Sequence, residues 1–288
     1  MLEQSDLHRM LDLVHAGAPE SRIKEEARKV QARLNPHPAG QMELNVPKLD
    51  SEPVEGIQHK YRQTVLFFPS AGQTCHAYCS YCFRWAQFVG IGDLKFAARE
   101  SAQLVEYLRQ HKEVTSVLIT GGDPLIMKPP LLHRYIEPLL NSELDHITSI
   151  RIGTKALAFW PYRFTHGEDS QDLLRLFDEV RAAGKNLALM AHCSHPRELE
   201  PEVAQLAVRR VVDTGATVRC QAPLIRHVND SHHVWAEMWK AQVRLGAIPY
   251  YMFVERDTGA KNYFEVPLAR AYRIFTRALE RCSGLERT

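Results

Sequence analysis

The sequence lacks the features that mark membrane, secreted and nucleic-acid-binding proteins. No apolar run is longer than a strand such as VLFF or SVLI, so no transmembrane helix is expected, and the polar start MLEQSDLHRM does not resemble a signal peptide. Lysine plus arginine (36) nearly balance aspartate plus glutamate (34), which leaves no basic excess for nucleic acid. We therefore expect a cytoplasmic protein that binds neither nucleic acid nor membrane.

Cysteine is also scarce, but three of the six cysteines, Cys75, Cys79 and Cys82, lie within eight residues. The other three are isolated in the sequence: Cys193, Cys220 and Cys282. Thiols stay reduced in the cytoplasm, so a tight group indicates metal binding or catalysis. Structural zinc requires four ligands, whereas three thiolates suit a [4Fe–4S] cluster with one open iron. The alternatives are structural zinc with His76 as an awkward fourth ligand, or unrelated cysteines.

From about residue 62 onward, short β-rich runs alternate with stretches of helical periodicity. The β-rich runs begin near Val65, Ser116, Ser149, Asn186, Thr217 and Ile248. The helical stretches cover about 95–111, 130–141, 170–183, 200–213, 231–245 and 267–281. The runs are continuously apolar, which indicates strands covered on both faces. Six such units predict an α/β fold with a parallel sheet, a partial (β/α)6 barrel, with a doubly wound sheet as the alternative.

The first 60 residues differ from the rest in pattern. Residues 6–15 and 20–34 have the periodicity of amphipathic helices, and a proline-rich extended strap follows them. We therefore expect an N-terminal extension over residues 1–60 and one barrel domain over 61–288. Asn229 and Asp230 are predicted to cap the helix that begins near Ser231.

The spacing Cys75-x3-Cys79-x-aromatic-Cys82, in the loop after the first strand, resembles the cluster motif of radical S-adenosylmethionine (SAM) enzymes. In that superfamily the open iron binds the amino and carboxylate groups of SAM, and an electron from the cluster cleaves SAM to a 5′-deoxyadenosyl radical. The resemblance implies that Tyr81 contacts the adenine.

The segment GGDPL, directly after the second strand, resembles the superfamily's motif for the SAM amino group. The residues concerned are Gly121, Gly122, Asp123 and Pro124. Glycine lets the backbone approach a ligand closely, and Asp123 adds an acceptor suited to an ammonium group. Gln221, in the fifth predicted strand, resembles the glutamine near the SAM ribose.

A longer stretch, from about residue 53 to 280, resembles lysine 2,3-aminomutase and its relatives. The segments that carry the likeness are PVEGIQHKY, CFR, TGGDPL, IRIGT, HCSHPREL, Gln221, VND and PYY. The resemblance implies that Arg84 holds the carboxylate of a substrate amino acid. It also implies that Tyr61 lies beside pyridoxal phosphate (PLP), and that His192 and His195 line the cavity.

Three departures from this family separate the functional hypotheses. The glycine-rich segment with the PLP lysine is not found, and the segment most similar to it is DTGAKNY, which contains Lys261. Thr64 stands where the family has an arginine against the PLP phosphate, although Arg62 is close by. Arg256 stands where the family has the acid that grips the lysine side chain, which disfavours lysine as the substrate.

The leading hypothesis is a C-terminally short aminomutase-like enzyme that binds a [4Fe–4S] cluster and SAM and abstracts hydrogen from an amino acid. With PLP the amino group would migrate between carbons two and three. The alternatives are a PLP-free radical SAM enzyme acting on another small molecule, and an inactive homologue that binds SAM and the cluster. The resemblance further implies an electron donor such as a flavodoxin or ferredoxin, and assembly into a homo-oligomer.

Overall fold

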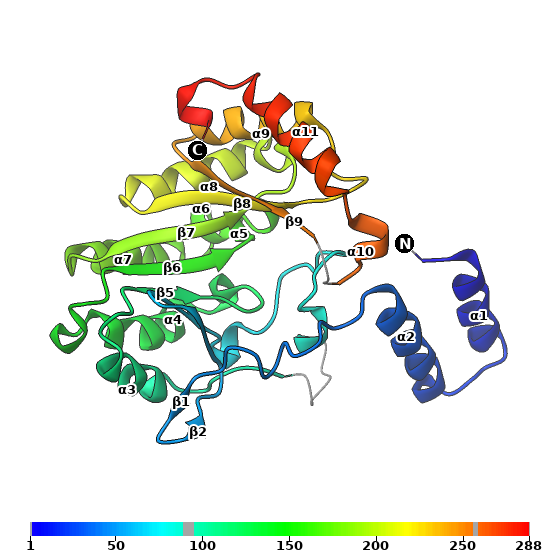
Figure 1. Ribbon diagram of the computed structural model, residues 1–288, viewed down its shortest axis with the longest axis horizontal. Coiled ribbons are helices and arrows are strands. Elements are labelled where there is room, and N and C mark those ends of the chain that lie inside the picture. The colour runs from blue at the N-terminus through cyan, green and yellow to red at the C-terminus, as the bar shows by residue number, and fades with distance from the viewer. Residues whose placement is uncertain (1, 89–94, 256–258, 288) are drawn as a thin grey trace.

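The computed structural model describes residues 2–88, 95–255 and 259–287, and its centre is a curled sheet with the strand order β3-β4-β5-β6-β7-β8-β9 (Figure 1). The strands are β3 (Ile57–Tyr61), β4 (Thr64–Phe67), β5 (Ser116–Ile119), β6 (Ser149–Thr154), β7 (Asn186–His192), β8 (Thr217–Leu224) and β9 (Ile248–Val254). Strands β4 to β9 run parallel, and β3 pairs antiparallel with β4. The predicted α/β half-barrel with six parallel strands is confirmed.

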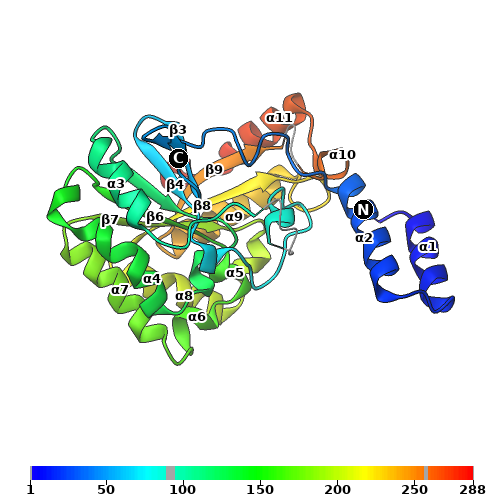
Figure 2. The same ribbon diagram turned by 90° about the horizontal axis from the view of Figure 1, so that it is seen from below.

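Helices follow the parallel strands and cover the convex face of the sheet (Figures 1 and 2). They are α3 (Ala102–Gln110), α4 (Pro129–Ile136), α5 (Ala156–Phe159), α6 (Tyr162–Thr165), α7 (Ser170–Ala182), α8 (Glu202–Asp213), α9 (His232–Arg244), α10 (Lys261–Phe264) and α11 (Leu268–Leu279). Successive strands are always neighbours, whereas a doubly wound sheet reverses its strand order, so that alternative is wrong. No described helix is long and apolar enough to cross a membrane.

Burial alternates along the strands, contrary to the expectation that both faces are covered. In β6, Ile150 and Ile152 are buried against the helices, while Arg151 and Gly153 are only partly buried on the concave side. Strand β8 shows the same alternation over its whole length. The reason is that a half-barrel packs helices on one face only, and its other face is left to line a cavity.

The N-terminal segment reaches the sheet and the loop after β4. Helices α1 (Gln4–His15) and α2 (Glu20–Leu34) form a hairpin that projects to one side of the sheet (Figures 1 and 2). The segment after them contains a small hairpin of β1 (Lys48–Leu49) and β2 (Glu52–Pro53), followed by β3, which adds an edge strand that the sequence pattern did not predict. The five-residue IQHKY has too little periodicity to stand out from the extended strap.

Candidate functional site

A cavity of about 560 Å³ lies on the concave side of the sheet, at the C-terminal ends of the parallel strands. This is where α/β barrels and sheets place ligands, because the connecting loops there converge. The sequence-predicted residues that line it are Cys75, Cys79, Tyr81, Cys82, Arg84, Gly121, Gly122, Asp123, His192 and Gln221. Segments that lie far apart in the chain, from β4 to the end of β9, therefore face one space.

The three cysteines lie in a loop, residues 73–84, that contains neither helix nor strand. Both ends of this loop are anchored. The side-chain amide of Gln73 donates to the carbonyl of Pro69 at 3.0 Å, and that of Asn35 donates to the carbonyl of Cys82 at 3.1 Å. The end of α2 thus holds the loop in place over the sheet.

The cysteine loop fits an iron–sulfur cluster by its donor chemistry and by its position. All three thiols line the same cavity, and three thiolates leave one iron of a [4Fe–4S] cluster open. As placed, no group of three or more His, Cys, Asp or Glu side chains in the described residues is arranged to hold a metal ion. Bringing the three sulfurs onto one cluster therefore requires a rearrangement of this loop, which has no ladder hydrogen bonds to lose.

Without a bound cation the thiols are held in their neutral form. Burial raises the pKa of Cys75 to about 12 and that of Cys82 to about 11, and burial also raises the pKa of Cys79. A coordinating metal reverses this preference, because its charge deprotonates a thiol outright. Cluster binding at this loop must therefore release protons.

The glycines after β5 allow the second loop to pack directly beneath the cysteine loop. A Cβ atom at Gly122 would lie 2.3 Å from the carbonyl oxygen of Thr74. A Cβ atom at Gly121, whose φ is +137°, would lie 2.0 Å from the side-chain nitrogen Nε2 of Gln73. The backbone N–H of Asp123 also donates to the carbonyl of Thr74 at 2.7 Å. The turn therefore positions the start of the cysteine loop, besides offering its backbone to the cavity.

The carboxylate of Asp123 is already engaged within the protein. It accepts hydrogen bonds from the hydroxyl of Thr154 at 2.8 and 2.9 Å, from the backbone N–H of Lys155 at 2.8 Å and from that of Leu125 at 3.0 Å. These bonds join the turn after β5 to the end of β6. Asp123 was predicted to accept a hydrogen bond from an ammonium group, whereas in this structure its carboxylate already accepts from groups of the protein. Pro124 is buried, begins a short 3₁₀ turn and does not line the cavity.

Arg84 presents a positive charge to the cavity without an acidic partner among the described residues. Its guanidinium carbon lies 4.7 Å from the ring centroid of Phe68 and 5.2 Å from that of Phe83, so aromatic faces support it on two sides. Burial lowers the pKa of Arg84 to about 10, which leaves it cationic at neutral pH. The arrangement suits an anionic ligand group such as a carboxylate.

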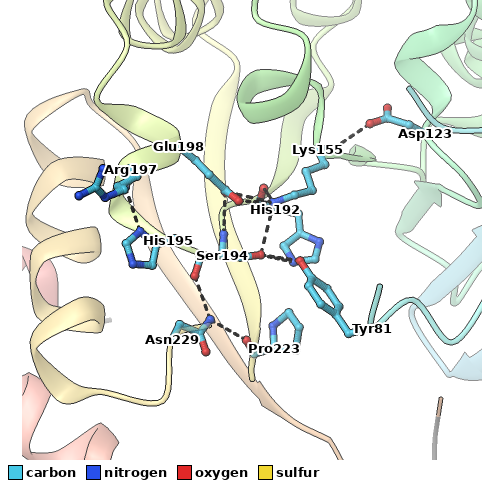
Figure 3. Close-up of polar contacts among 10 residues, drawn as sticks. All are labelled: Tyr81, Asp123, Lys155, His192, Ser194, His195, Arg197, Glu198, Pro223 and Asn229. Carbon is cyan, nitrogen blue, oxygen red and sulfur yellow. Dashed lines mark hydrogen bonds and ion pairs between the residues drawn. The ribbon is translucent and has the colours of Figure 1, made fainter. Parts of the chain in front are cut away.

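A polar network connects the cysteine loop to the ends of three strands (Figure 3). The phenol of Tyr81 and the hydroxyl of Ser194 are 2.7 Å apart, and the latter lies 3.2 Å from Nε2 of His192. The ammonium of Lys155 donates to Ser194 at 3.3 Å and pairs with the carboxylate of Glu198 at 2.9 and 3.1 Å. Ser194 is therefore the point through which β6, β7 and the loop are joined.

The network also sets the charge of the cavity wall. Burial first, and then the nearby ammonium of Lys155, hold the pKa of His192 well below its ordinary value, so its imidazole is neutral. Glu198 neutralises Lys155 and also accepts from the backbone N–H of Ser194 at 2.8 Å. Of the two cations described here, only Arg84 lacks an acid within reach.

Two other sequence-predicted residues have supporting positions outside the cavity. Nδ1 of His195 accepts from the backbone N–H of Arg197 at 3.2 Å and caps a 3₁₀ turn, Pro196–Leu199, so His195 does not face the cavity (Figure 3). The amide of Asn229 donates to the carbonyls of Ser194 and Pro223 at 2.9 and 3.0 Å. The predicted helix cap at Asn229 and Asp230 is wrong, because neither side chain caps α9.

Tyr61 lies away from the cysteine cavity. It pairs with Thr64 at the N-terminal end of β4, opposite the end from which the cysteine loop leaves, and it is 62% exposed. Lys261 begins α10 and does not line the cavity either. Arg256 lies outside the described residues. The geometry therefore adds no support for a PLP molecule held by Tyr61 within the cysteine cavity.

Sequence reasoning missed three charged residues that line or support the cavity: Lys155, Glu198 and Glu255. Lys155 directly follows IRIGT and Glu198 lies inside HCSHPREL, so both were within segments already singled out. Burial, reinforced by the charge of Glu265, raises the pKa of Glu255 to about 7, and its Oε2 is buried without a partner. For Glu255, the signal available in the sequence was an acidic residue at the end of a predicted parallel strand.

Comparison with known proteins finds relatives that match most of the chain. A putative L-lysine 2,3-aminomutase of Aquifex aeolicus is 35% identical over 233 residues, which are 81% of this chain and 60% of that protein. The L-lysine 2,3-aminomutase of Clostridium subterminale is 26% identical over 274 residues, 95% of this chain and 62% of that protein. The chain is a homologue of the lysine 2,3-aminomutases. It spans about three fifths of the length of these relatives.

Solved structures of other proteins resemble this chain in fold. A radical SAM methyltransferase from Sphaerobacter thermophilus matches with a TM-score of 0.51 at 16% identity, over 96% of this chain and 91% of that chain. SuiB of Streptococcus suis bound to S-adenosylmethionine matches with a TM-score of 0.50 at 14% identity, over 96% and 57%. At these identities the likeness shows a radical SAM type of fold. No protein-family model matches the chain.

Proposed function

We propose that the chain is the barrel of a radical SAM enzyme of the lysine 2,3-aminomutase type, which abstracts hydrogen from an amino acid. The observation that carries the proposal is that the three cysteines, the glycine turn and the guanidinium of Arg84 line one cavity. Such a cavity brings a cluster-binding loop, a close-packed backbone for a cofactor and a carboxylate-binding cation within reach of one ligand.

Cys75, Cys79 and Cys82 would hold a [4Fe–4S] cluster, and SAM would bind beside Tyr81, Gln221 and the glycine turn. Bound and reduced, these groups supply a 5′-deoxyadenosyl radical. The role of this chain's residues is to position the partners: Ser194 holds the phenol of Tyr81, and Asp123 holds the turn against β6. A reductant such as a flavodoxin or ferredoxin would deliver the electron.

Arg84 would bind the carboxylate of the substrate amino acid. Its guanidinium offers several N–H donors, and the faces of Phe68 and Phe83 limit the solvent that competes for them. The neutral imidazole of His192 adds no charge to the wall of the same cavity. A carboxylate bound there orients the substrate in the same cavity as the cysteines.

Amino-group migration requires PLP, and the described residues do not supply its covalent anchor. The one lysine that lines the cavity in the described part of the chain is Lys155, whose ammonium is paired with Glu198. A lysine nitrogen engaged by Glu198 is not free to act as a nucleophile. We therefore derive no PLP-dependent step from these residues.

A second candidate is a PLP-free radical SAM enzyme that abstracts hydrogen from another carboxylate-bearing small molecule. This candidate needs the cluster, SAM and Arg84 but no lysine nucleophile. Absorbance near 420 nm in the purified protein, at about the wavelength where imines of PLP absorb, separates the aminomutase from this candidate. Its absence after incubation with PLP favours the PLP-free enzyme.

The test is anaerobic reconstitution with iron and sulfide, followed by reduction in the presence of SAM and chromatography for 5′-deoxyadenosine. We expect the wild type to form 5′-deoxyadenosine and Cys79→Ala to form none. Cys282→Ala, which removes a buried cysteine outside the cavity, is the matched control and should behave as the wild type. A wild type that carries a full cluster and never cleaves SAM would indicate an inactive homologue.

A further inference from the structure

Helix α11 carries a row of arginines along one side. Its sequence LARAYRIFTRAL contains three arginines and no acidic residue, and a fourth arginine follows two residues after its end. These residues recur at steps of three and four, which places them on one side of a helix: Arg270, Arg273, Arg277 and Arg281. All four are exposed, and the last three form no ion pair in the described part of the chain. Since positive and negative side chains nearly balance over the whole sequence, the row is a local excess of positive charge.

The row extends to the turn that follows β8. Within the described residues, Arg270 is the member of the row with an acidic partner, because one Nη donates to the carboxylate of Asp230 at 2.6 Å. The backbone N–H of His227, in that turn, donates to the same carboxylate at 3.1 Å. The preceding residue, Arg226, is exposed and has no ion pair among the described residues. Arg226 and the four arginines of the row thus form one cationic surface, which we name the arginine surface.

The arginine surface adjoins the cysteine loop. The backbone N–H of Arg226 donates to the carbonyl of Phe264, at the end of α10, at 2.8 Å. The ring of Phe264 lies edge-on to the ring of Tyr81, with centroids 5.9 Å apart, and Tyr81 directly precedes Cys82. Helix α10 lies beside the cysteine loop and leads into α11 (Figure 1). Phe264 thus connects one end of the arginine surface to the loop that carries the three cysteines.

Exposed apolar side chains accompany the arginines. Leu268 and Tyr272 on α11 are 73% and 68% exposed, and Tyr263 on α10 is 39% exposed. The ring of Tyr263 lies 4.8 Å from that of His227, between centroids, so it belongs to the same surface. Arginine and aromatic residues are enriched where proteins bind one another. A net charge of only +2 disfavours nucleic acid, so the composition favours an acidic protein as the partner.

We propose that the arginine surface docks an acidic electron-transfer protein, which supplies the electron for cleavage of SAM. The inference rests on the function proposed above, because radical SAM chemistry requires such a donor. The donor loses one electron, and SAM gains it through the cluster as its S–C bond breaks to methionine and the 5′-deoxyadenosyl radical. Positive charge attracts an acidic protein and orients it, and the contact with Phe264 places it beside the cysteine loop. Redox complexes have small interfaces, so a few arginines account for much of the recognition.

Binding is tested without turnover by isothermal titration calorimetry of the reconstituted protein. The probes are an oxidised flavodoxin and an oxidised plant-type ferredoxin, titrated separately. We expect at least one of them to bind, and its affinity to fall at least about ten-fold when the ionic strength rises from about 0.05 M to about 0.5 M, because salt screens exposed charges. Neither donor binding to the wild type would overturn the proposal.

The variants Arg273→Glu and Arg277→Glu should each weaken donor binding at least about five-fold, because each reverses one charge on the arginine surface. Arg209→Glu, which reverses an exposed arginine on α8, is the matched control and should leave binding unchanged. Glutamate and arginine have similar helix propensities, so all three variants should fold, and thermal unfolding checks this. Variants of the surface that bind the donor as the wild type does would overturn the proposal.

Two kinds of reductant separate docking from catalysis. Dithionite is small and needs no docking surface, so it should drive formation of 5′-deoxyadenosine equally in the wild type and in both surface variants. With the flavodoxin or ferredoxin kept reduced by its reductase, the variants should need at least about five-fold more donor for the half-maximal rate. An equal loss with dithionite would show that the arginines act on the catalytic site, and would overturn the proposal.

Mixed tRNA is the probe for the competing class of partner. Binding of tRNA that Arg273→Glu and Arg277→Glu weaken, without binding of either donor, would identify a nucleic-acid surface and overturn the proposal. A wild type that forms no 5′-deoxyadenosine with dithionite contradicts the proposed function, whereas calorimetry with the oxidised donors still decides the docking. Failure of the surface and failure of the radical SAM assignment are therefore distinguishable.

Discussion

Lys155 and Glu198 form an ion pair whose side chains are only 10% and 19% exposed. Removing one partner of such a pair leaves a buried charge, which costs about 3 kcal/mol in the free energy of unfolding. We therefore expect Glu198→Ala to be destabilised by about that amount, as measured by urea denaturation. The double variant Lys155→Met/Glu198→Leu should recover most of the loss. A single variant as stable as the wild type would contradict the role given to this pair.

Glu255 makes stability depend on pH in an identifiable range. Its pKa is raised from 4.5 to about 7 in the folded protein, so the folded state binds more protons than the unfolded state between these values. The contribution of Glu255 to the free energy of unfolding therefore falls as pH rises from about 4.5 to 7. We expect Glu255→Gln to unfold at a higher temperature than the wild type at pH 8 and to differ little at pH 4.5. Equal differences at both pH values would refute this assignment.

At the residue scale, the sequence predicted site residues that belong to one short motif. It did not predict hydrogen bonds and ion pairs between residues that are far apart in the chain. Cys75, Cys79 and Cys82 are recognisable because eight residues contain the whole pattern. Asp123 bonds to residues 31 and 32 positions away, and Lys155 to one 43 away, so no local pattern shows that either is already engaged. The position of Tyr61 outside the cavity is likewise set by strand pairing and not by a local pattern. The ligand roles of the other residues remain predictions.

The turn after β5 is an element whose shape depends on glycine. A side chain at Gly122 would collide with the backbone of Thr74, which cannot move away without displacing the cysteine loop. We expect Gly122→Ala to bind at most about half as much iron per chain as the wild type after reconstitution, while the fold is retained because the collision is local. Gly284→Ala, with open space around its Cβ, is the control. Full iron content in Gly122→Ala, by a colorimetric iron assay, would contradict the packing role.

Elements with strong periodicity were predicted closely, and elements set by tertiary contacts were not. The sequence placed the six parallel strands and the major helices, because each repeats apolar residues at its own period. It missed β3 and the short helices α5, α6 and α10, which have five residues or fewer. It also predicted strands covered on both faces, because a cavity lined by Met190, Leu66 and Phe253 has the same apolar composition as a core.

For the whole molecule, ligand binding should appear as added stability. A ligand at about 100 times its Kd adds about 2.7 kcal/mol to the free energy of unfolding. For a chain of this size that corresponds to an increase in Tm of about 5 °C. We expect SAM to produce such a shift in cluster-loaded protein without reductant, measured by calorimetry, and to produce none in Cys79→Ala. An equal shift in both proteins would mean that SAM binds independently of the cluster.

The two outermost strands of the sheet share one feature: β3 and β9 each contain a register irregularity, at Gln58–Tyr61 and at Tyr250. A half-barrel, unlike a closed barrel, ends in two edge strands on which another chain could add a strand. An interrupted ladder, with Pro249 removing one N–H from β9, is a poor template for such addition. The irregularities thus allow the barrel to remain open for a ligand while resisting edge-to-edge aggregation.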